Sequence, residues 1–202
     1  MKLYRAIIKT ISPLVKFFLR VNIIDERKNK DYDGTFVICA NHLSNWDPIL
    51  VLVATQLEIS FMAKESLFKI PVLKQILNGL GAAFPVNRKG SDMASIKKSI
   101  EIIKNGGHFS LFPQGRRLHV EPSPEQAKKG IGFICAKSGA SVLPIGIYTN
   151  KYRIMPFRKI TVRIGDIIPY ENINFGEDGS DYLLASQGIF EKICHLARRS
   201  DT

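Results

Sequence analysis

The chain has 202 residues, 45% of them hydrophobic, so it can bury a substantial core and is not disordered. Its 29 Lys and Arg residues exceed its 18 Asp and Glu residues, and the formal net charge of +11 favours an anionic partner such as nucleic acid, anionic lipid or a phosphorylated substrate. Three scattered cysteines, Cys39, Cys135 and Cys194, suit a reducing cytosolic location better than a disulfide framework or a metal site. No uninterrupted apolar stretch approaches the ~20 residues that span a bilayer.

The N-terminal segment predicts an amphipathic helix when it is advanced by about 100° per residue. One narrow sector collects the cations Lys2, Arg5, Lys9, Lys16 and Arg20. The opposite side collects Leu3, Ile7, Ile11, Leu14, Val15 and Phe18. The pattern fits a helix that lies in a membrane interface, a helix that packs on the domain, or one that does both. Pro13 is expected to kink or split it. We therefore assign residues 1–24 to a membrane-associating segment and residues 25–202 to the folded domain.

Strand and helix patterns alternate through the rest of the chain. Strands are predicted at 35–40, 59–63, 82–86, 108–112, 142–148 and 160–165. Helices are predicted at 48–58, around Leu67, at 73–80, at 91–104 with Ser91 as a possible N-cap, at 125–138, and in a final segment capped by Ser180 or Asp181 that ends at Arg198 and Arg199. This alternation predicts a single α/β domain with a largely parallel central sheet flanked by helices.

Polar clusters follow three of the predicted strands, at residues 41–47, 87–89 and 113–117. Ligands of such sheets bind beyond the carboxyl ends of the strands, so neighbouring strands would bring these clusters to one rim. Within the first cluster, Asp47 followed by Pro48 is a good N-cap and N1 pair, and His42 alone reads as a loop residue. Alternatively, Asp47 accepts a hydrogen bond from one ring nitrogen of His42 and leaves the other free as a general base.

The order of four motifs resembles that of the glycerolipid acyltransferases, most closely the 1-acylglycerol-3-phosphate acyltransferases. Those sequences carry N-H-x-x-x-x-D, an Arg-ended block, F-P-E-G-T-R and a Pro-containing strand. The matching blocks here are His42-x-x-x-x-Asp47, Phe84-Pro-Val-Asn-Arg88, Phe112-Pro-Gln-Gly-Arg-Arg117 and Val142-Leu-Pro144. The resemblance covers roughly residues 35 to 165, and it implies that the segment 25–202 is an acyltransferase domain.

The resemblance implies that an acyl thioester, from acyl-CoA or acyl carrier protein, acylates the free hydroxyl of lysophosphatidic acid to give phosphatidic acid. His42 would take the hydroxyl proton, and Asp47 would orient the imidazole. No G-x-S-x-G motif occurs, which favours direct transfer, although Ser44 stays open as a nucleophile. No metal or other cofactor is expected. Membrane lipids are the expected partners, and the expected location is peripheral or monotopic, on the cytoplasmic face of the cell membrane.

The substrate-binding residues implied by the resemblance are Lys64, Arg88, Gln114, Gly115, Arg116 and Arg117. Guanidinium groups suit bidentate phosphate binding, and Gly115 permits close backbone approach. Gln114 and Arg116 replace the usual Glu and Thr, so this site is more cationic than is typical. Three interpretations of these two replacements stay open: the site holds a more anionic acceptor, it pairs with acidic groups elsewhere, or the enzyme has reduced activity. Alternative functions are acylation of another lysolipid and weakly active lipid binding. A nucleic-acid role is not expected, because the domain has no recognised motif or basic-aromatic stripe.

Overall fold

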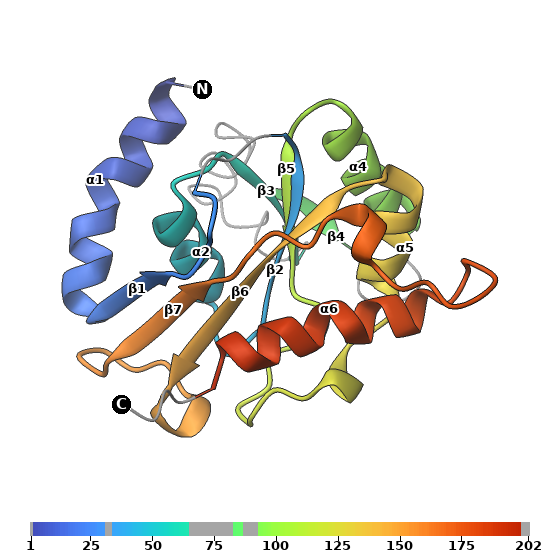
Figure 1. Ribbon diagram of the computed structural model, residues 1–202. Coiled ribbons are helices and arrows are strands. Elements are labelled where there is room, and N and C mark those ends of the chain that lie inside the picture. The colour runs from blue at the N-terminus through green and yellow to red at the C-terminus, as the bar shows by residue number, and fades with distance from the viewer. Residues whose placement is uncertain (1, 31–33, 65–82, 87–92, 199–202) are drawn as a thin grey trace.

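A seven-stranded sheet forms the centre of the computed structural model, which describes residues 2–30, 34–64, 83–86 and 93–198 (Figure 1). The strand order is β1-β7-β6-β2-β5-β3-β4, and every pair is parallel except β6 with β7. The strands are β1 (Val21–Asp25), β2 (Phe36–Ala40), β3 (Ile59–Lys64), β4 (Ala83–Val86), β5 (His108–Leu111), β6 (Ser141–Thr149) and β7 (Ile160–Ile164). The predicted α/β class and largely parallel sheet are confirmed.

Helices cover both faces of this sheet (Figure 1). The α-helices described are α1 (Lys2–Phe18), α2 (Asp47–Thr55), α4 (Met93–Lys104), α5 (Gly130–Ser138) and α6 (Tyr182–Leu196). The short 3₁₀ helices in the described residues are η2 (Pro124–Gln126), η3 (Asn150–Tyr152) and η4 (Tyr170–Asn172). Strand β2 is buried at all five positions and serves both cores, because alternate side chains leave opposite faces of a strand. Val37 and Cys39 join the core under α5 and α6, whereas Ile38 joins the core under α2.

Helix α1 packs on the domain through one flank of its apolar face. Tyr4, Ile8 and Leu19 are buried, and the Tyr4 hydroxyl both accepts from the Ile59 N–H (3.0 Å) and donates to the Ile59 carbonyl (3.2 Å). The other flank stays exposed, with Leu14 at 56%. The docking half of the prediction is therefore confirmed, and Pro13 lies within one assigned helix rather than dividing it in two. Among the described residues, no helix has both the length and the apolarity to cross a membrane.

Two predicted helices differ from the structure. Helix α2 ends at Thr55 rather than at 58, because Gln56 adopts a left-handed conformation (φ 57°) and its N–H caps the Leu52 carbonyl. The predicted helix at 125–138 is split into η2 and α5. Ala127 is extended between them, and the N–H of Lys128 donates to the Pro113 carbonyl (2.9 Å), which ties this segment to the loop after β5.

Other boundaries were confirmed in part. Asp181 is the N-cap of α6 and accepts from the Leu184 N–H (2.8 Å), but the helix ends at Leu196, before the predicted arginines. Strand β1 was not predicted, and it runs across the boundary placed after residue 24. The short helices expected around 67 and 73–80 and the cap at Ser91 lie outside the described residues.

Candidate active site

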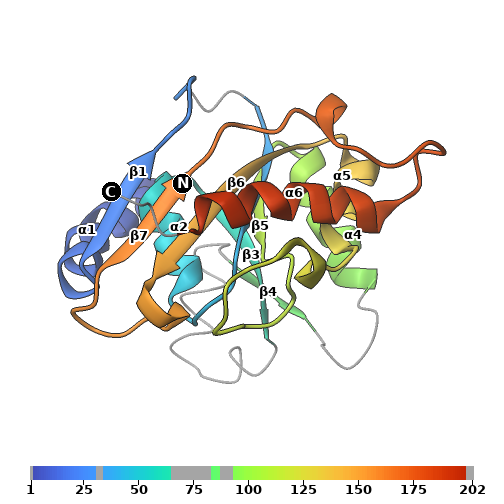
Figure 2. The same cartoon turned by 60° about the horizontal axis from the view of Figure 1, so that its bottom comes forward.

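The loop that follows β2 lies at the carboxyl edge of the sheet, between the ends of β5 and β6. Asn41 fastens the start of this loop to β6 by two buried hydrogen bonds. Its amide nitrogen donates to the Ile147 carbonyl (2.9 Å), and its amide oxygen accepts from the Ile147 N–H (2.7 Å). The loop is thus held by the sheet rather than by its own turn alone. Figure 2 turns this edge toward the viewer and shows the 112–128 loop across its front.

Asp47 and His42 form a buried pair in this loop. The fully buried Asp47 places Oδ2 2.6 Å from His42 Nδ1, and the same oxygen accepts from the N–H groups of Leu43 (2.6 Å) and Ser44 (2.7 Å). The predicted N-cap role of Asp47 is wrong: Trp46 occupies the cap position without a side-chain hydrogen bond, and Asp47 is the first residue of α2. Its carboxylate therefore stabilises the preceding loop instead of the helix amides.

The imidazole of His42 is held in one orientation by two neighbours. Because Nδ1 faces the carboxylate, the neutral ring carries its proton on Nδ1 and presents Nε2 as an acceptor. The ring also stacks on Phe112, with centroids 4.2 Å apart and planes 13° apart. Within the described part of the chain, Nε2 has no hydrogen-bond partner. This geometry suits a general base.

Gln114 lies beneath the same loop and is only 1% exposed. Its side-chain oxygen accepts from the N–H of His42 (2.7 Å), and its nitrogen donates to the side-chain oxygen of Gln126 (2.7 Å). Gln126 in turn donates to the Glu121 carbonyl (3.1 Å). Substrate binding by Gln114 stays a prediction, and its contacts support a positioning role. Sequence reasoning missed Gln126; the signal was the amide at position 114, since a buried amide N–H₂ needs an acceptor.

Pro113 is buried, whereas Gly115, Arg116 and Arg117 of the same cluster are exposed beside the His42 loop. Arg117 donates to the side-chain oxygen of Asn45 (3.0 Å), so the two predicted clusters do meet at one rim. Gly115 has φ +66°, and a Cβ there would lie 3.3 Å from the Lys128 side chain, so glycine suits both the turn and the contact. Arg116 is exposed. The ligand-binding roles of Gly115, Arg116 and Arg117 stay predictions.

Two other predicted ligand-binding residues are only partly placed. Lys64 ends β3 and pairs in register with Val86 of β4, so its backbone lies at the same edge of the sheet. Arg88, with the rest of the 87–89 cluster, lies outside the described residues. The roles of Lys64 and Arg88 stay predictions.

Other nucleophiles fit the site less well. Cys39 and Cys135 are buried free thiols, and burial raises the pKa of Cys135 to about 12 and that of Cys39 well above its ordinary value, which disfavours the reactive thiolate. The hydroxyl of Ser44 accepts from the Trp46 N–H (3.3 Å), so it is engaged by the loop backbone. These contacts favour direct attack by an acceptor hydroxyl.

The chain is similar to curated acyltransferases. The chain is 30% identical over 135 residues to the 1-acyl-sn-glycerol-3-phosphate acyltransferase of Borreliella burgdorferi, covering 65% of this chain and 53% of that protein. It is 34% identical over 120 residues to the enzyme of the same name from Bacillus subtilis, covering 58% of each. The chain thus spans little more than half the length of these relatives.

A solved structure and a family model complete the comparison. The crystal structure of the 1-acyl-sn-glycerophosphate (LPA) acyltransferase PlsC from Thermotoga maritima superposes with a TM-score of 0.73 at 23% identity, covering 98% of this chain and 81% of that one. This likeness shows the same fold. The model of the Acyltransferase family matches residues 20–148, a segment that contains both the His42 loop and the 113–117 cluster. The chain belongs to the Acyltransferase family.

Proposed function

We propose that this protein transfers an acyl chain from an acyl thioester to the free hydroxyl of lysophosphatidic acid, giving phosphatidic acid for phospholipid synthesis. The observation that carries the proposal is the 2.6 Å contact between His42 Nδ1 and the buried Asp47 Oδ2, which leaves Nε2 as an acceptor at the carboxyl edge of the sheet. The names of the curated relatives support lysophosphatidic acid as the acceptor.

In this mechanism Nε2 of His42 removes the hydroxyl proton while the acceptor oxygen attacks the thioester carbonyl. An ester C–O bond forms, the C–S bond breaks, and the imidazolium returns its proton to the departing thiolate. Asp47 stabilises that imidazolium and holds its ring in place. General-base catalysis of this kind contributes about 10²–10⁴-fold to a rate, so the pair accounts for part of the acceleration.

The acceptor phosphate is proposed to bind above the loop, at Arg116 and Arg117. Arg117 is joined to Asn45, three residues after His42, so a phosphate there would hold the hydroxyl end of the substrate near Nε2. Arg88 and Lys64 are proposed as further phosphate ligands on the family resemblance alone. We propose peripheral association with the cytoplasmic face of the membrane, because the acceptor and the product are both lipids.

A donor-by-acceptor panel tests this function. The full chain is supplied with acyl-CoA or acyl carrier protein thioesters as donors and with lysophosphatidate, lysophosphatidylcholine or monoacylglycerol as acceptors. The lipid products are identified by mass spectrometry. Phosphatidate is the expected main product, formed with at least one of the two carriers. Faster acylation of lysophosphatidylcholine would move the assignment to another lysolipid. No product with any pair from a folded protein would favour lipid binding without turnover.

A further inference from the structure

Three phenylalanine side chains stand in solvent at the C-terminal end of α1 and in the 150–159 loop between β6 and β7. Phe17 is 74% exposed, Phe18 is 53% exposed and Phe157 is 61% exposed. Their rings form one row, with centroids 5.6 Å apart between Phe17 and Phe18 and 6.3 Å apart between Phe18 and Phe157. Apolar groups gathered this way forgo the stabilisation that burial would give, and contiguous exposed apolar patches mark interaction sites.

The row is held by backbone contacts between segments that are far apart in the chain. The N–H of Phe157 donates to the Phe18 carbonyl (3.0 Å), and the N–H of Ile160 donates to the Arg20 carbonyl (3.3 Å). Phe157 has φ +61°, in the left-handed region that bulky side chains rarely adopt. Such strain persists only where the surrounding structure imposes it, and here it accompanies a ring that faces solvent.

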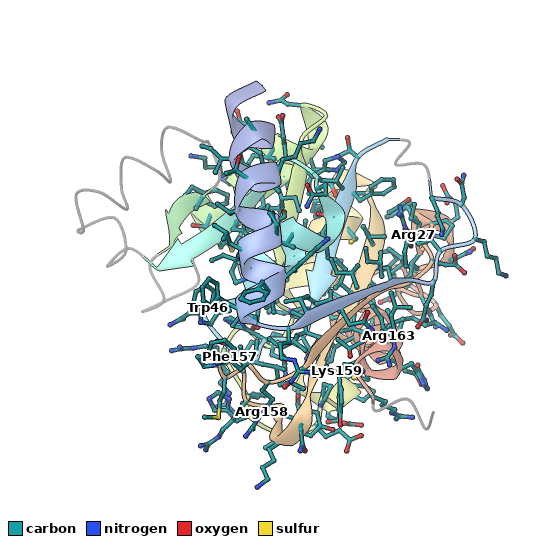
Figure 3. The ribbon with its side chains drawn as sticks, turned by 90° about the vertical axis from the view of Figure 1, so that its left-hand side faces the viewer. Arg27, Trp46, Phe157, Arg158, Lys159 and Arg163 are labelled. Carbon is teal, nitrogen blue, oxygen red and sulfur yellow. The ribbon has the colours of Figure 1, made fainter. Side chains whose placement is uncertain are left out.

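Only cations accompany these rings among the charged residues of the two segments. Residues 1–24 contain five Lys or Arg and no acid, and residues 150–159 contain four and no acid. Lys16, Arg20 and Lys159 are exposed beside the aromatic row. Figure 3 shows Phe157, Arg158 and Lys159 on the side of the molecule that carries α1. Aromatic rings among cations suit an anionic lipid surface, where rings enter the interface and cations meet headgroups.

The 150–159 loop lies at the same edge of the sheet as the His42 loop, because the two loops follow the neighbouring parallel strands β6 and β2. The 150–159 loop continues from β6, whose Ile147 holds Asn41. Within that loop the Tyr152 carbonyl lies 3.3 Å from Nδ1 of His119, in the segment that follows the 113–117 cluster. Trp46 of the His42 loop is 45% exposed and appears on the same side of the molecule as Phe157 (Figure 3).

We propose that Phe17, Phe18 and Phe157 insert together into an anionic lipid leaflet, with Lys16, Arg20 and Lys159 against its headgroups, and that this surface sets the His42 loop at the lipid interface. The contact is thus made by the folded domain as well as by the amphipathic helix. The insertion itself does not depend on the proposed function; only its consequence for a lipid substrate rests on that function.

Vesicle co-sedimentation of the full chain tests the insertion. The variant is Phe157→Gly, which removes the ring and suits the left-handed φ, so the loop can keep its fold. The matched control is Leu183→Ala, because Leu183 is 46% exposed on α6, and α6 packs in a different core from the one that contains Leu19 and α2. On vesicles of phosphatidylcholine and phosphatidylglycerol in equal parts, Phe157→Gly should partition about ten-fold more weakly, as expected for one lost Phe contact. Leu183→Ala should match wild type, and Phe17→Ser with Phe157→Gly should weaken partitioning further.

Trp46, the single tryptophan of the chain, gives a second and independent readout. Brominated phosphatidylcholine in the same vesicles should quench its fluorescence in wild type and less so in Phe157→Gly at equal protein and lipid. Equal pelleting of Phe157→Gly and wild type would overturn the proposal. So would unquenched Trp46 in the membrane-bound protein, or a dimer of wild type in sedimentation velocity that Phe157→Gly abolishes.

An acyl-transfer assay on a water-soluble, short-chain lysophosphatidate tests the proposed function separately from membrane insertion. Phe157→Gly should keep the wild-type rate there and lose rate only on vesicle substrate. A wild-type chain that binds vesicles through Phe157 but transfers no acyl group to any acceptor would support the insertion and contradict the proposed function.

Discussion

One carboxylate oxygen of Asp47 organises the candidate site. Oδ2 accepts from the His42 ring and from the N–H groups of Leu43 and Ser44. The same charge that would stabilise an imidazolium therefore also fixes the shape of the loop. Replacing Asp47 would disturb both, so its effect on rate would not isolate catalysis, whereas substitution of His42 leaves the two backbone hydrogen bonds of the loop in place.

The amide pair of Gln114 and Gln126 offers a sharper test of positioning. Gln114→Glu keeps an acceptor for the His42 N–H, and Gln126 can rotate its amide to donate, so activity should stay within a few-fold. Gln126→Glu alone should likewise be tolerated, because it keeps an acceptor for the Gln114 amide and loses only the exposed hydrogen bond to the Glu121 carbonyl. The double variant places two carboxylates against each other with no donor between them, which should cost stability far beyond the sum of the singles.

The coupling between positions 114 and 126 is measured by urea unfolding and turnover of four proteins, which are wild type, Gln114→Glu, Gln126→Glu and the double variant. Gln114→Leu is the companion variant, and it should lose about 1–3 kcal/mol by leaving the His42 N–H and Gln126 without their partner. Additive effects in the double variant would argue against a direct contact between the two amides.

Arg117 is expected to act on the acceptor rather than on the donor. Arg117→Ala should raise KM for lysophosphatidate much more than KM for the thioester, because a guanidinium binds phosphate bidentately. Arg117→Lys should restore only part of the loss. Monoacylglycerol, which has no phosphate, serves as the control acceptor. Equal losses for both acceptors would assign Arg117 to holding Asn45 and the loop.

At the scale of elements, Tyr4 joins α1 to β3. Burial raises the pKa of its hydroxyl from 10.0 to about 12, so folding favours the neutral form. The stability that this provides is fully present below about pH 10 and is lost as the pH rises toward about 12. Tyr4→Phe removes the hydroxyl that bonds both polar groups of the Ile59 backbone and should lower the free energy of unfolding by about 1–3 kcal/mol at neutral pH.

Urea unfolding at about pH 8 and about pH 11 measures this dependence. The difference in the free energy of unfolding between wild type and Tyr4→Phe should be smaller at the higher pH. Tyr182→Phe is the control for ionisation of the other tyrosines. A difference that is unchanged between the two pH values would show that Tyr4 ionises as freely in the folded protein as in the unfolded chain.

The sequence predicted most elements because their patterns are strong and local. The continuous apolar run of β2 is one example, and the Asp181 cap of α6 is another. Strand β1 was not predicted, because its residues are half-buried or exposed and gain their order from pairing with β7, a partner that local periodicity does not reveal. The break between η2 and α5 was not predicted either, because it depends on a contact from outside the segment, the hydrogen bond from the Lys128 N–H to the Pro113 carbonyl.

The candidate site was predictable as residues but not as contacts. The spacing of His42 and Asp47 suggested the hydrogen-bonded pair that the structure shows. The spacing alone did not distinguish an Asp47 carboxylate that bonds the amides of the preceding loop from one that caps the helix. The amide at position 114 indicated that a buried acceptor was needed, but not that Gln126 supplies it, because the fold brings these two residues together.

At the scale of the whole molecule, lipid attachment should combine charge and burial. Each cation near an anionic surface is worth about 1 kcal/mol, and that attraction is screened beyond a Debye length of about 10 Å at 0.1 M salt. Binding to anionic vesicles should therefore weaken as salt is added but level off at a remainder from the inserted rings. In Phe157→Gly the binding that remains at high salt should be weaker than in wild type, whereas the salt-dependent part of the binding should be unchanged. Binding that vanishes entirely at high salt in wild type would contradict insertion.

The central claim is that His42 is the general base of acyl transfer to lysophosphatidate. Its most direct test is the single-turnover rate of phosphatidate formation by full-length wild type and His42→Ala, both shown to be folded by circular dichroism and assayed on detergent-dispersed lysophosphatidate. His42→Ala should lower this rate by at least the ~10²–10⁴-fold that a general base contributes. A folded His42→Ala protein that forms phosphatidate at close to the wild-type rate would contradict the claim.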